Sequence, residues 1–445
     1  MLRGQMPTAP PLGLRRELGR WDLTAIGINQ VIGVGIFLIP AAVAAQLGSW
    51  SWIGVVLAGM ASLLVALCFA EAGSRFESTG GPYLYSRAAF GRFVGFEVGW
   101  MQWFTRVCSQ AAVVNGIAVA LAFYWPPISS GIGRATIIIA VTLTFAIINV
   151  RGIRSSAWVV KALTIAKLAP LAILIAVGIF FVDRSRLIPS GAISARQAAE
   201  GMLLLIFLFG GYDVVPVPAG EATGPKKQVP FALVTTILAV TAIMTAAQVV
   251  AQGTLVDEAH SKTPLADAAF VTMGSLGALL IGAGSVISMI GHNAGGLLSG
   301  PRVLFALAEN RELPRWFGEI HPRFRTPANA VVFTSAVSLT LALSGSLEKL
   351  AIASAVARLV PYISACAATL MLRRPKYAGL VGPAAFVIPF GPTIPLLGLT
   401  ISVAILGGAT ATQALSGLAA LAAGAAFFAI GSRTRASELA NPAAS

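Results

Sequence analysis

Charged residues are scarce in this chain. Only 11% of its 445 residues are Asp, Glu, Lys or Arg, whereas 56% are hydrophobic. Soluble globular domains carry about 25% charged residues, because their surfaces must be hydrated. The composition therefore excludes an ordinary soluble domain and indicates an integral membrane protein that crosses the bilayer several times.

Cysteine and histidine are also rare, with three residues of each. Cys68, Cys108 and Cys366 stand singly in apolar segments and show no metal-ligand spacing. We expect them to be small buried hydrophobic side chains, with no disulfide framework and no metal site. No nucleophile and base stand together, so the sequence predicts neither an enzyme nor a bound cofactor.

Long apolar runs fill most of the chain and predict an all-α fold of twelve transmembrane helices. They occupy residues 22–47, 50–73, 94–122, 132–150, 156–182, 200–221, 229–252, 270–305, 327–345, 349–372, 383–408 and 413–431. The residues before and after them, 1–20 and 432–445, are predicted to form polar tails.

The net charge of +14 raises the question of a nucleic-acid partner. If the N-terminus is cytoplasmic, 22 of the 31 Lys and Arg residues fall in cytoplasmic segments, six in external segments and three within spans. The positive-inside rule therefore accounts for the basic balance, and no nucleic acid is needed. We expect both tails to be cytoplasmic and the protein to lie in the plasma (inner) membrane.

The first span contains a weak point in the middle of the bilayer. Gly33 and Gly35 flank Val34, and each glycine costs a helix roughly 1 kcal/mol. Broken backbone in a membrane is tolerated only where it is buried in protein or lines a polar cavity. Free N–H groups at such a break attract an anion and free carbonyls attract a cation, and an amino acid carries both charges.

The sixth span repeats this pattern. Gly210 and Gly211 are followed by the carboxylate of Asp213, again at mid-membrane depth. Corresponding breaks in two halves of a membrane protein indicate a transport site between them. The nearby Phe207 and Phe209 either close over a small ligand or serve only in packing.

Ionisable residues inside spans are costly and are functional candidates by default. Arg106 in the third span either contacts the substrate pocket, near Gln110, or has a structural role and pairs with Glu97 or Asp213. Lys167 lies about ten residues from either end of the fifth span, too deep to reach water easily. It either gains and loses a proton during transport or remains charged and holds the carbonyls of a broken helix.

Two further polar segments leave alternatives open. His292 and Asn293 lie in the eighth span, where a hydrogen-bonded structural histidine ranks ahead of a substrate contact. The Gly-Gly-Pro turn within residues 78–83 is either a plain connector or a loop beneath the first helix that gates the cytoplasmic exit.

Taken in order, these segments resemble the amino acid-polyamine-organocation (APC) superfamily from Trp21 to about Arg374. The matching stretches are Val31 to Phe37, Gly80 to Tyr83, Asn149 to Gly152, Lys167, Phe209 to Asp213, Ala219 to Glu221, Arg302, and Leu313-Pro314 to Thr326-Pro327. The resemblance implies a LeuT-like fold, with inverted repeats at residues 21–182 and 200–374 and two added helices within 383–431. The first helix of each repeat is expected to be discontinuous.

The resemblance also implies a substrate site. The substrate carboxylate is expected at the N–H groups of Gly33, Val34 and Gly35. The α-amino group is expected at carbonyls near Val31 and Ile32 and in the stretch from Phe207 to Gly210. Phe207 resembles the gating aromatic of the family, and Lys167 resembles the lysine that replaces a sodium ion in sodium-independent members.

The run from Arg106 to Gln110 is similar to the L-type amino acid transporter branch, although Val107 replaces a common proline and Val34 a common serine. Some members of that branch form a disulfide with an ancillary glycoprotein through a cysteine between spans three and four. Residues 122–134 contain no cysteine, so no disulfide-linked subunit is expected. Gly417 and Gly424 favour close helix packing, and the last two spans are a possible oligomer surface.

These observations predict a sodium-independent amino acid transporter that works by alternating access, either as a proton-coupled symporter or as an exchanger. Neutral L-amino acids are favoured because few carboxylates lie near the site. Asp213 leaves a cationic amino acid or polyamine open as an alternative substrate. A membrane amino acid sensor that does not translocate, and an ion channel or ion transporter on the same fold, are the other hypotheses.

Overall fold

The computed structural model describes residues 14–33, 35–122, 125–345, 347–407 and 411–440. Val34 of the predicted substrate site lies outside the described residues. Within the described residues the fold is all-helical, and the only extended pairing is an isolated parallel bridge between Leu18 and Ala222.

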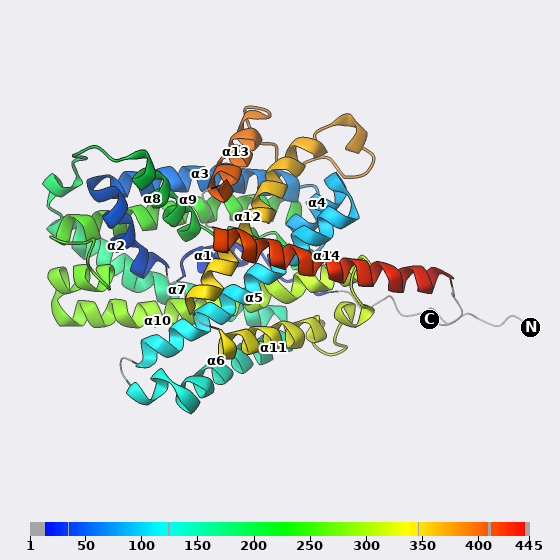
Figure 1. The fold of residues 1–445 in the computed structure, drawn as a ribbon, viewed down its shortest axis with the longest axis horizontal. Helices are drawn as coiled ribbons and strands as arrows, with labels where there is room; N and C mark the ends of the chain where they lie inside the picture. The colour runs from blue at the N-terminus through cyan, green and yellow to red at the C-terminus, as the bar shows by residue number, and fades with distance from the viewer. Residues whose placement is uncertain (1–13, 34, 123–124, 346, 408–410, 441–445) are drawn as a thin grey trace, which may run out of the picture.

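Fourteen α-helices form the body of the described chain (Figure 1). They are α1 (Arg20–Val31), α2 (Gly35–Leu47), α3 (Ser51–Gly73), α4 (Pro82–Phe90), α5 (Arg92–Ala122), α6 (Gly131–Arg151), α7 (Ile153–Gly178), α8 (Ala195–Leu208), α9 (Pro225–Thr254), α10 (Pro264–Glu309), α11 (Ala328–Ser344), α12 (Leu347–Leu372), α13 (Thr393–Gly407) and α14 (Ala411–Ala440).

Short 3-10 helices join or follow them. They are η1 (Gly48–Trp50), η2 (Pro126–Ser129), η3 (Ile179–Phe181), η4 (Arg184–Leu187), η5 (Tyr212–Val214), η6 (Val217–Glu221), η7 (Arg315–Gly318) and η8 (Pro375–Tyr377).

Both predicted interruptions are present. The first span is divided into α1 and α2, and the helix of the sixth span, α8, stops at Leu208. After this break, the rest of the predicted sixth span forms the short 3-10 helices η5 and η6 and no α-helix. Pro216 and Pro218 explain the 3-10 conformation, since proline lacks the N–H that a continuing helix needs.

The predicted eleventh span is wrong at its start, because α13 begins at Thr393 and not at residue 383. Pro383, Pro389 and Pro392 punctuate the intervening loop, and Phe390 adopts a positive φ of 62°. The helix α10 begins at Pro264, before the predicted start of the eighth span at residue 270. Gly274, with φ 71° and ψ −162°, separates its first part from the long span that follows.

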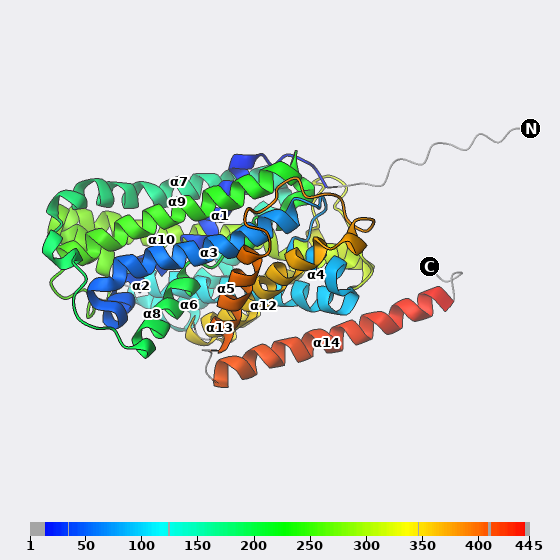
Figure 2. The same ribbon diagram turned by 90° about the horizontal axis from the view of Figure 1, so that it is seen from above.

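Among the residues that the structure describes, five helical segments are long and apolar enough to cross a membrane by length and composition. They are Ile39–Gly73, Gly131–Arg151, Ala157–Phe181, Pro225–Thr254 and Pro264–Glu309. Most long helices run along one axis of the molecule, and α14 lies at the edge of the bundle (Figures 1 and 2). The broken helix α1 is enclosed by α7, α9 and α10.

The segment before α1 is tied to the segment after η6. The amides of Glu17 and Leu18 both donate to the carbonyl of Glu221 at 2.9 Å, and the Thr223 amide donates to the Leu18 carbonyl at 3.0 Å. The Glu221 side chain forms a fully buried ion pair with Arg302 of α10. We call residues 17–19, the segment before α1, the strap. Through Glu221 and Arg302 the strap and the end of η6 are both connected to α10.

The turn before α4 packs against the same region. The Gly80 amide donates to the Val217 carbonyl at 3.0 Å, and a Cβ placed on Gly220 would lie 2.4 Å from the Thr79 hydroxyl. The turn therefore contacts η6 directly, whereas the gating alternative had placed it beneath the first helix. The choice between a plain connector and a gating loop stays a prediction.

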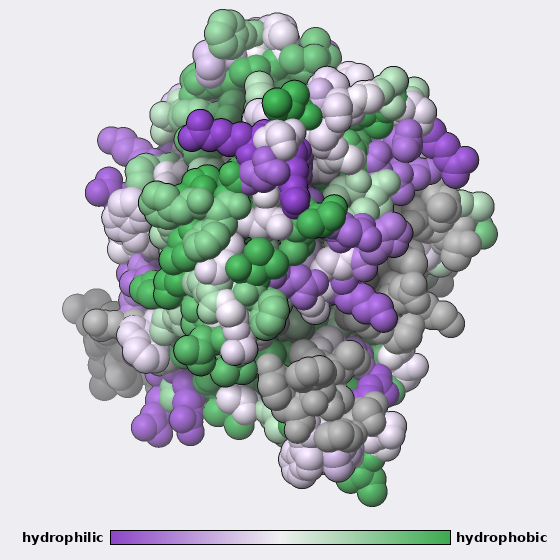
Figure 3. Space-filling view, turned by 90° about the vertical axis from the view of Figure 1, so that its left-hand side faces the viewer, coloured by the Kyte–Doolittle hydropathy of each residue, from purple (hydrophilic) through white to green (hydrophobic). Residues whose placement is uncertain are grey.

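The opposite end of the molecule carries the connections of α7 to α8 and α9 to α10. Figure 3 shows hydrophilic residues in several separate patches among apolar ones on this face. Glu258, in the α9–α10 connection, has a side chain only 6% exposed, and its Oε1 accepts a hydrogen bond from Gln248 at 2.8 Å. Burial raises the pKa of Glu258 to about 8.

This raised pKa predicts that stability depends on pH. The unfolded chain releases the Glu258 proton near pH 4.5, whereas the folded protein keeps it until about pH 8. Stability should therefore fall as the pH rises from about 5 to 8, by up to roughly 4 kcal/mol. Thermal unfolding in detergent across this range should show a decline that Glu258→Gln removes. Glu200→Gln, a control whose side chain is 42% exposed, should keep the wild-type slope.

Candidate functional site

The interruption of the first span is compact. The Ile32 amide still donates to the Ile28 carbonyl at 2.8 Å, but Ile32 leaves the helical region with φ −78° and ψ 84°. The Gly33 amide donates to the Val31 carbonyl at 2.9 Å, and α2 begins at Gly35. The turn therefore leaves the carbonyls at the end of α1 without helical partners.

Lys167 of α7 supplies partners for these carbonyls. Its side chain is fully buried, and Nζ donates to the carbonyls of Asn29 at 2.9 Å and Ile32 at 2.5 Å. A third bond of 3.4 Å reaches the Ser288 carbonyl of α10. An ammonium at a helix C-terminus is favoured by the helix dipole, so Lys167 stabilises the broken end of α1.

Ser288 is a second support that sequence reasoning missed. Its hydroxyl lies 3.1 Å from the Ile32 carbonyl and 2.9 Å from the Gly33 carbonyl. Serine is common in membrane helices as a packing residue, and no motif marks this one. Only the position of α10 beside α1 shows its role.

The second interruption touches the first. Gly211 adopts a φ of 131°, and a Cβ placed on it would lie 2.7 Å from the Gln30 carbonyl of α1. Only glycine combines this backbone conformation with such a close approach. The Gly211 amide donates to the Tyr362 hydroxyl of α12 at 3.4 Å. The two breaks are therefore packed against each other, as the sequence predicts.

The predicted polar residues Arg106 and Asp213 form an ion pair. Nη2 of Arg106 lies 2.9 Å and 3.2 Å from the two carboxylate oxygens of Asp213, and both side chains are 1% exposed. Nη1 of Arg106 also donates to the Gln30 side chain at 3.3 Å. Of the two structural partners considered for Arg106, Asp213 is therefore the observed one. Glu97 lies instead beside Gly424 of α14.

The segment of α10 that contains His292 is bonded to α1 and α5. One ring nitrogen of His292 lies 3.1 Å from the Gln30 carbonyl, and the other lies 3.0 Å from the Ser109 hydroxyl. The side chain of Gln30 donates to the His292 carbonyl at 2.6 Å. His292 therefore has the hydrogen bonds of a structural histidine.

Polar atoms without partners lie beside this network. Asn293 donates to the Gln110 carbonyl at 3.3 Å. The amide oxygen and nitrogen of the Gln110 side chain are buried and have no hydrogen-bond partner within the described residues, and the same holds for the side-chain oxygen of Asn29. Buried polar groups are normally satisfied, so these three atoms are candidates for ligand contacts.

The aromatic and glycine residues of the second break have different positions. Phe209 is fully buried in the hydrophobic core, whereas the side chain of Phe207 is outside the described residues. A Cβ placed on Gly210 would overlap the guanidinium of Arg358, a residue of α12 to which the sequence motifs gave no role. Arginine in mid-membrane was the signal that could have identified it.

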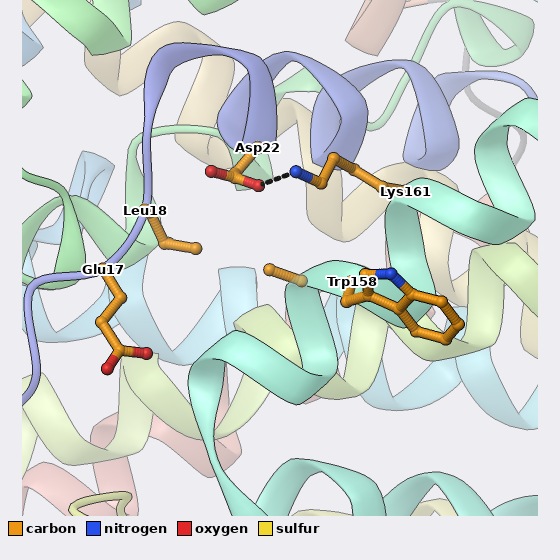
Figure 4. Close-up of a pocket in the computed structure, with 6 residues that line it drawn as sticks. Glu17, Leu18, Asp22, Trp158 and Lys161 are labelled. Carbon is orange, nitrogen blue, oxygen red and sulfur yellow. Dashed lines mark ion pairs between the residues drawn. The ribbon is translucent and has the colours of Figure 1, made fainter.

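A small cavity of about 440 Å³ lies at the start of α1 (Figure 4). An ion pair of 2.8 Å between Asp22 of α1 and Lys161 of α7 bridges it, and Glu17, Leu18 and Trp158 also line it. Its charged groups come from the segment before α1, from α1 and from α7. The cavity is separate from the central site, and its ion pair connects α1 to α7.

A family model described as amino acid permease matches residues 18–430. The chain belongs to the amino acid permease family. This permease is therefore a multi-pass membrane transporter of amino acids within the APC superfamily, and it is not an enzyme.

Several curated transporters are similar to the permease along most of their length. The serine/threonine exchanger SteT of Bacillus subtilis (strain 168) is 30% identical over 420 residues, which cover 91% of this chain and 93% of SteT. The branched-chain amino acid permease BcaP of the same strain is 29% identical, with 88% of each chain covered. A methylthioribose transporter of that strain is 26% identical, with 86% of each chain covered.

The contacts of Lys167 predict a large effect on stability. Lys167→Met should remove the ammonium donor from the carbonyls of Asn29 and Ile32, of which only Ile32 keeps a second donor nearby, Ser288. Each carbonyl left unsatisfied should cost about 1–3 kcal/mol. The thermal unfolding midpoint in detergent measures this loss. Lys161→Met on the same helix removes only a partly exposed ion pair and should cost about 1 kcal/mol or less. Equal effects of the two substitutions would contradict the role of Lys167.

The ion pair of Arg106 and Asp213 predicts coupling between the two positions. Asp213→Asn should destabilise the permease by about 3–5 kcal/mol, because it leaves a buried guanidinium without its counter-charge. Adding Arg106→Gln should recover a large part of that loss. A double-mutant cycle by denaturation in detergent gives the coupling energy, and strictly additive losses would show that the two charges do not interact.

Proposed function

We propose that the permease binds the α-carboxylate of its substrate at the amides of Gly33, Val34 and Gly35. The observation that carries this proposal is the direct contact between the two helix breaks, through Gly211 and the Gln30 carbonyl. The first amides of α2 have no helical acceptor and lie at the positive end of that helix. The Gly33 amide, which precedes α2, donates to the Val31 carbonyl at 2.9 Å and would exchange this bond for one to the substrate. A carboxylate is the natural partner for them.

The α-ammonium group is proposed to bind carbonyl oxygens of both breaks. On the α1 side these belong to Val31 and Ile32, and on the α8 side they lie between Phe207 and Gly210. Lys167 donates to the Ile32 carbonyl. The single hydroxyl hydrogen of Ser288 can go to the nearer Gly33 carbonyl, which leaves the second lone pair of Ile32 for the substrate. Phe207 is proposed to cover the bound ligand. Gln110 and Asn293 are proposed to line the side-chain pocket.

A neutral side chain is the proposed specificity. The only carboxylate of the second break, Asp213, is neutralised by Arg106, and Arg358 adds a second positive charge nearby. This arrangement disfavours a cationic amino acid or polyamine, for which Asp213 would have to be free. The names of SteT and BcaP, which specify serine, threonine and branched-chain amino acids, support the same choice.

We further propose sodium-independent exchange. The Nζ atom of Lys167 has three carbonyl acceptors, and only the charged ammonium supplies three N–H donors. Such a fixed positive charge takes the place of a bound cation and does not need a proton gradient. Proton symport through Lys167 remains the alternative mechanism.

Twelve spans in two inverted repeats, 21–182 and 200–374, are the proposed architecture for alternating access. The interrupted helix at the start of each half supports this division. Most Lys and Arg residues fall on the same side of the membrane as the two tails. The positive-inside rule then favours cytoplasmic tails and a location in the plasma (inner) membrane. All three cysteines are buried, which supports the absence of a disulfide-linked subunit, and α13 and α14 are the proposed surface for any oligomer.

Reconstituted protein tests this function. Proteoliposomes loaded with unlabelled serine or leucine should take up the labelled amino acid much faster than empty ones. Replacing sodium by choline should not change the rate, and Lys167→Met should abolish uptake.

If an imposed pH gradient alone drives accumulation into empty vesicles, the mechanism is proton symport and not exchange. Ligand binding without flux would identify a sensor, and uptake only of lysine or polyamines would overturn the proposed specificity.

A further inference from the structure

An apolar groove runs between α6 and α11, far from the central site. These two helices lie side by side along one edge of the bundle (Figure 1). The groove has a volume of about 440 Å³. Most of its lining side chains are apolar, including Leu143 and Ile147 of α6 and Val332 and Leu339 of α11.

The groove faces outward from the bundle. Leu143, Ile147 and Val332 are 49%, 52% and 57% exposed. In a membrane permease such side chains face lipid, and a concave surface among them accepts a flexible acyl chain better than a flat helix face does. Acyl chains are therefore the apolar groups available to fill it.

One end of the groove is cationic. Arg151 lines it at the last residue of α6, and no carboxylate of the described residues lies within ion-pair distance of its guanidinium. The guanidinium of Arg323 lies 5.5 Å from the ring centre of Phe324, and Phe324 also lines the groove. One positive charge therefore lines this end of the groove and a second lies beside one of its lining residues, at the end that the positive-inside rule places toward the cytoplasm.

The groove also contains a polar atom that lacks a partner. Ser335 of α11 is only 5% exposed, and its hydroxyl has no hydrogen-bond acceptor or donor among the described residues. A buried hydroxyl without a hydrogen bond is costly. An ester oxygen at the junction of headgroup and acyl chain is a partner of suitable chemistry.

We propose that this groove is a binding site for an anionic phospholipid. One acyl chain lies between α6 and α11, and the phosphate binds Arg151 and Arg323. Anionic headgroups suit basic pockets between transmembrane helices on the cytoplasmic side. A zwitterionic lipid carries its own cationic group beside the phosphate, so it adds no net negative charge to offset the two guanidinium groups.

The position of the site gives the lipid a structural role. The connection between α10 and α11 reaches the end of α6, where the Thr326 hydroxyl donates to the Val150 carbonyl at 2.8 Å. Arg323 belongs to this connection and Arg151 to α6. A phosphate held by both arginines adds a second bridge between the same two segments.

Native mass spectrometry of delipidated protein tests the proposal without any amino acid substrate. The probes are phosphatidylglycerol and phosphatidylcholine with identical acyl chains. We expect preferential retention of phosphatidylglycerol. Removing both arginines, in Arg151→Gln/Arg323→Gln, should weaken its binding roughly thirtyfold, because each basic residue contributes a similar electrostatic term.

A control pair separates this site from general surface charge. Lys227→Gln/Arg374→Gln removes two exposed positive charges elsewhere and should leave retention unchanged. A third variant, Ala336→Trp, fills the groove without changing charge and should also reduce retention. The unfolding midpoint of each variant, measured without added lipid, shows whether it has folded.

Three results would overturn the proposal. The first is equal retention of the two lipids by the wild type. The second is an equal loss in the control pair, and the third is full retention by a folded Arg151→Gln/Arg323→Gln variant. None of these results depends on whether the permease transports amino acids, so the proposed function stands or falls separately.

Discussion

The structure depends on one constraint: backbone N–H and C=O groups at a helix break inside the membrane need hydrogen-bond partners. Where α1 stops, its last carbonyls cannot turn to water, and hydrocarbon offers no donor. Lys167 and Ser288 meet this need from two neighbouring helices. A long helix of ordinary composition would have been easier to insert, so the cost of the break and of a buried ammonium indicates that the bare amides and carbonyls serve a purpose.

The second break has a different backbone structure but lies against the first one. Its carbonyls and amides come from a glycine pair and two 3-10 turns, and Gly211 brings them against α1. The charge that follows, Asp213, is held by Arg106 and is not left facing a ligand. At one end of the molecule, the strap before α1 and the Glu221–Arg302 pair hold the broken helices together. A motion that opens the site toward this end of the molecule must break the hydrogen bonds of the strap or the Glu221–Arg302 ion pair.

Much of this arrangement could be predicted from the sequence. Paired glycines in an apolar run mark a break because their helix propensity is low, and a lysine ten residues from each end of a span must find partners inside the protein. The choice between Glu97 and Asp213 as partner of Arg106 could not be made, because it depends on which face of α5 meets the second break. The eleventh span began too early because apolar residues between prolines resemble a helix in composition.

Other features required coordinates for similar reasons. Ser288 is one small polar residue among many, and its role comes only from the crossing of α10 over α1. The 3-10 conformation of η5 and η6 could not be predicted from the sequence, because proline is tolerated at the first turn of an α-helix as well as in loops. The pocket side chains of Gln110 and Asn293 could be proposed from their span, but their hydrogen bonds depend on the packing of three helices.

The most direct test of the central claim compares an amino acid with analogues that lack one charged group. Binding of a neutral amino acid to the purified permease should raise the thermal unfolding midpoint, because a ligand stabilises the state that binds it. If bare amides hold the carboxylate and bare carbonyls hold the ammonium, we expect neither the decarboxylated amine nor the corresponding hydroxy acid to produce this shift at the same concentration. Equal shifts with either analogue would contradict a site made from the two broken helices.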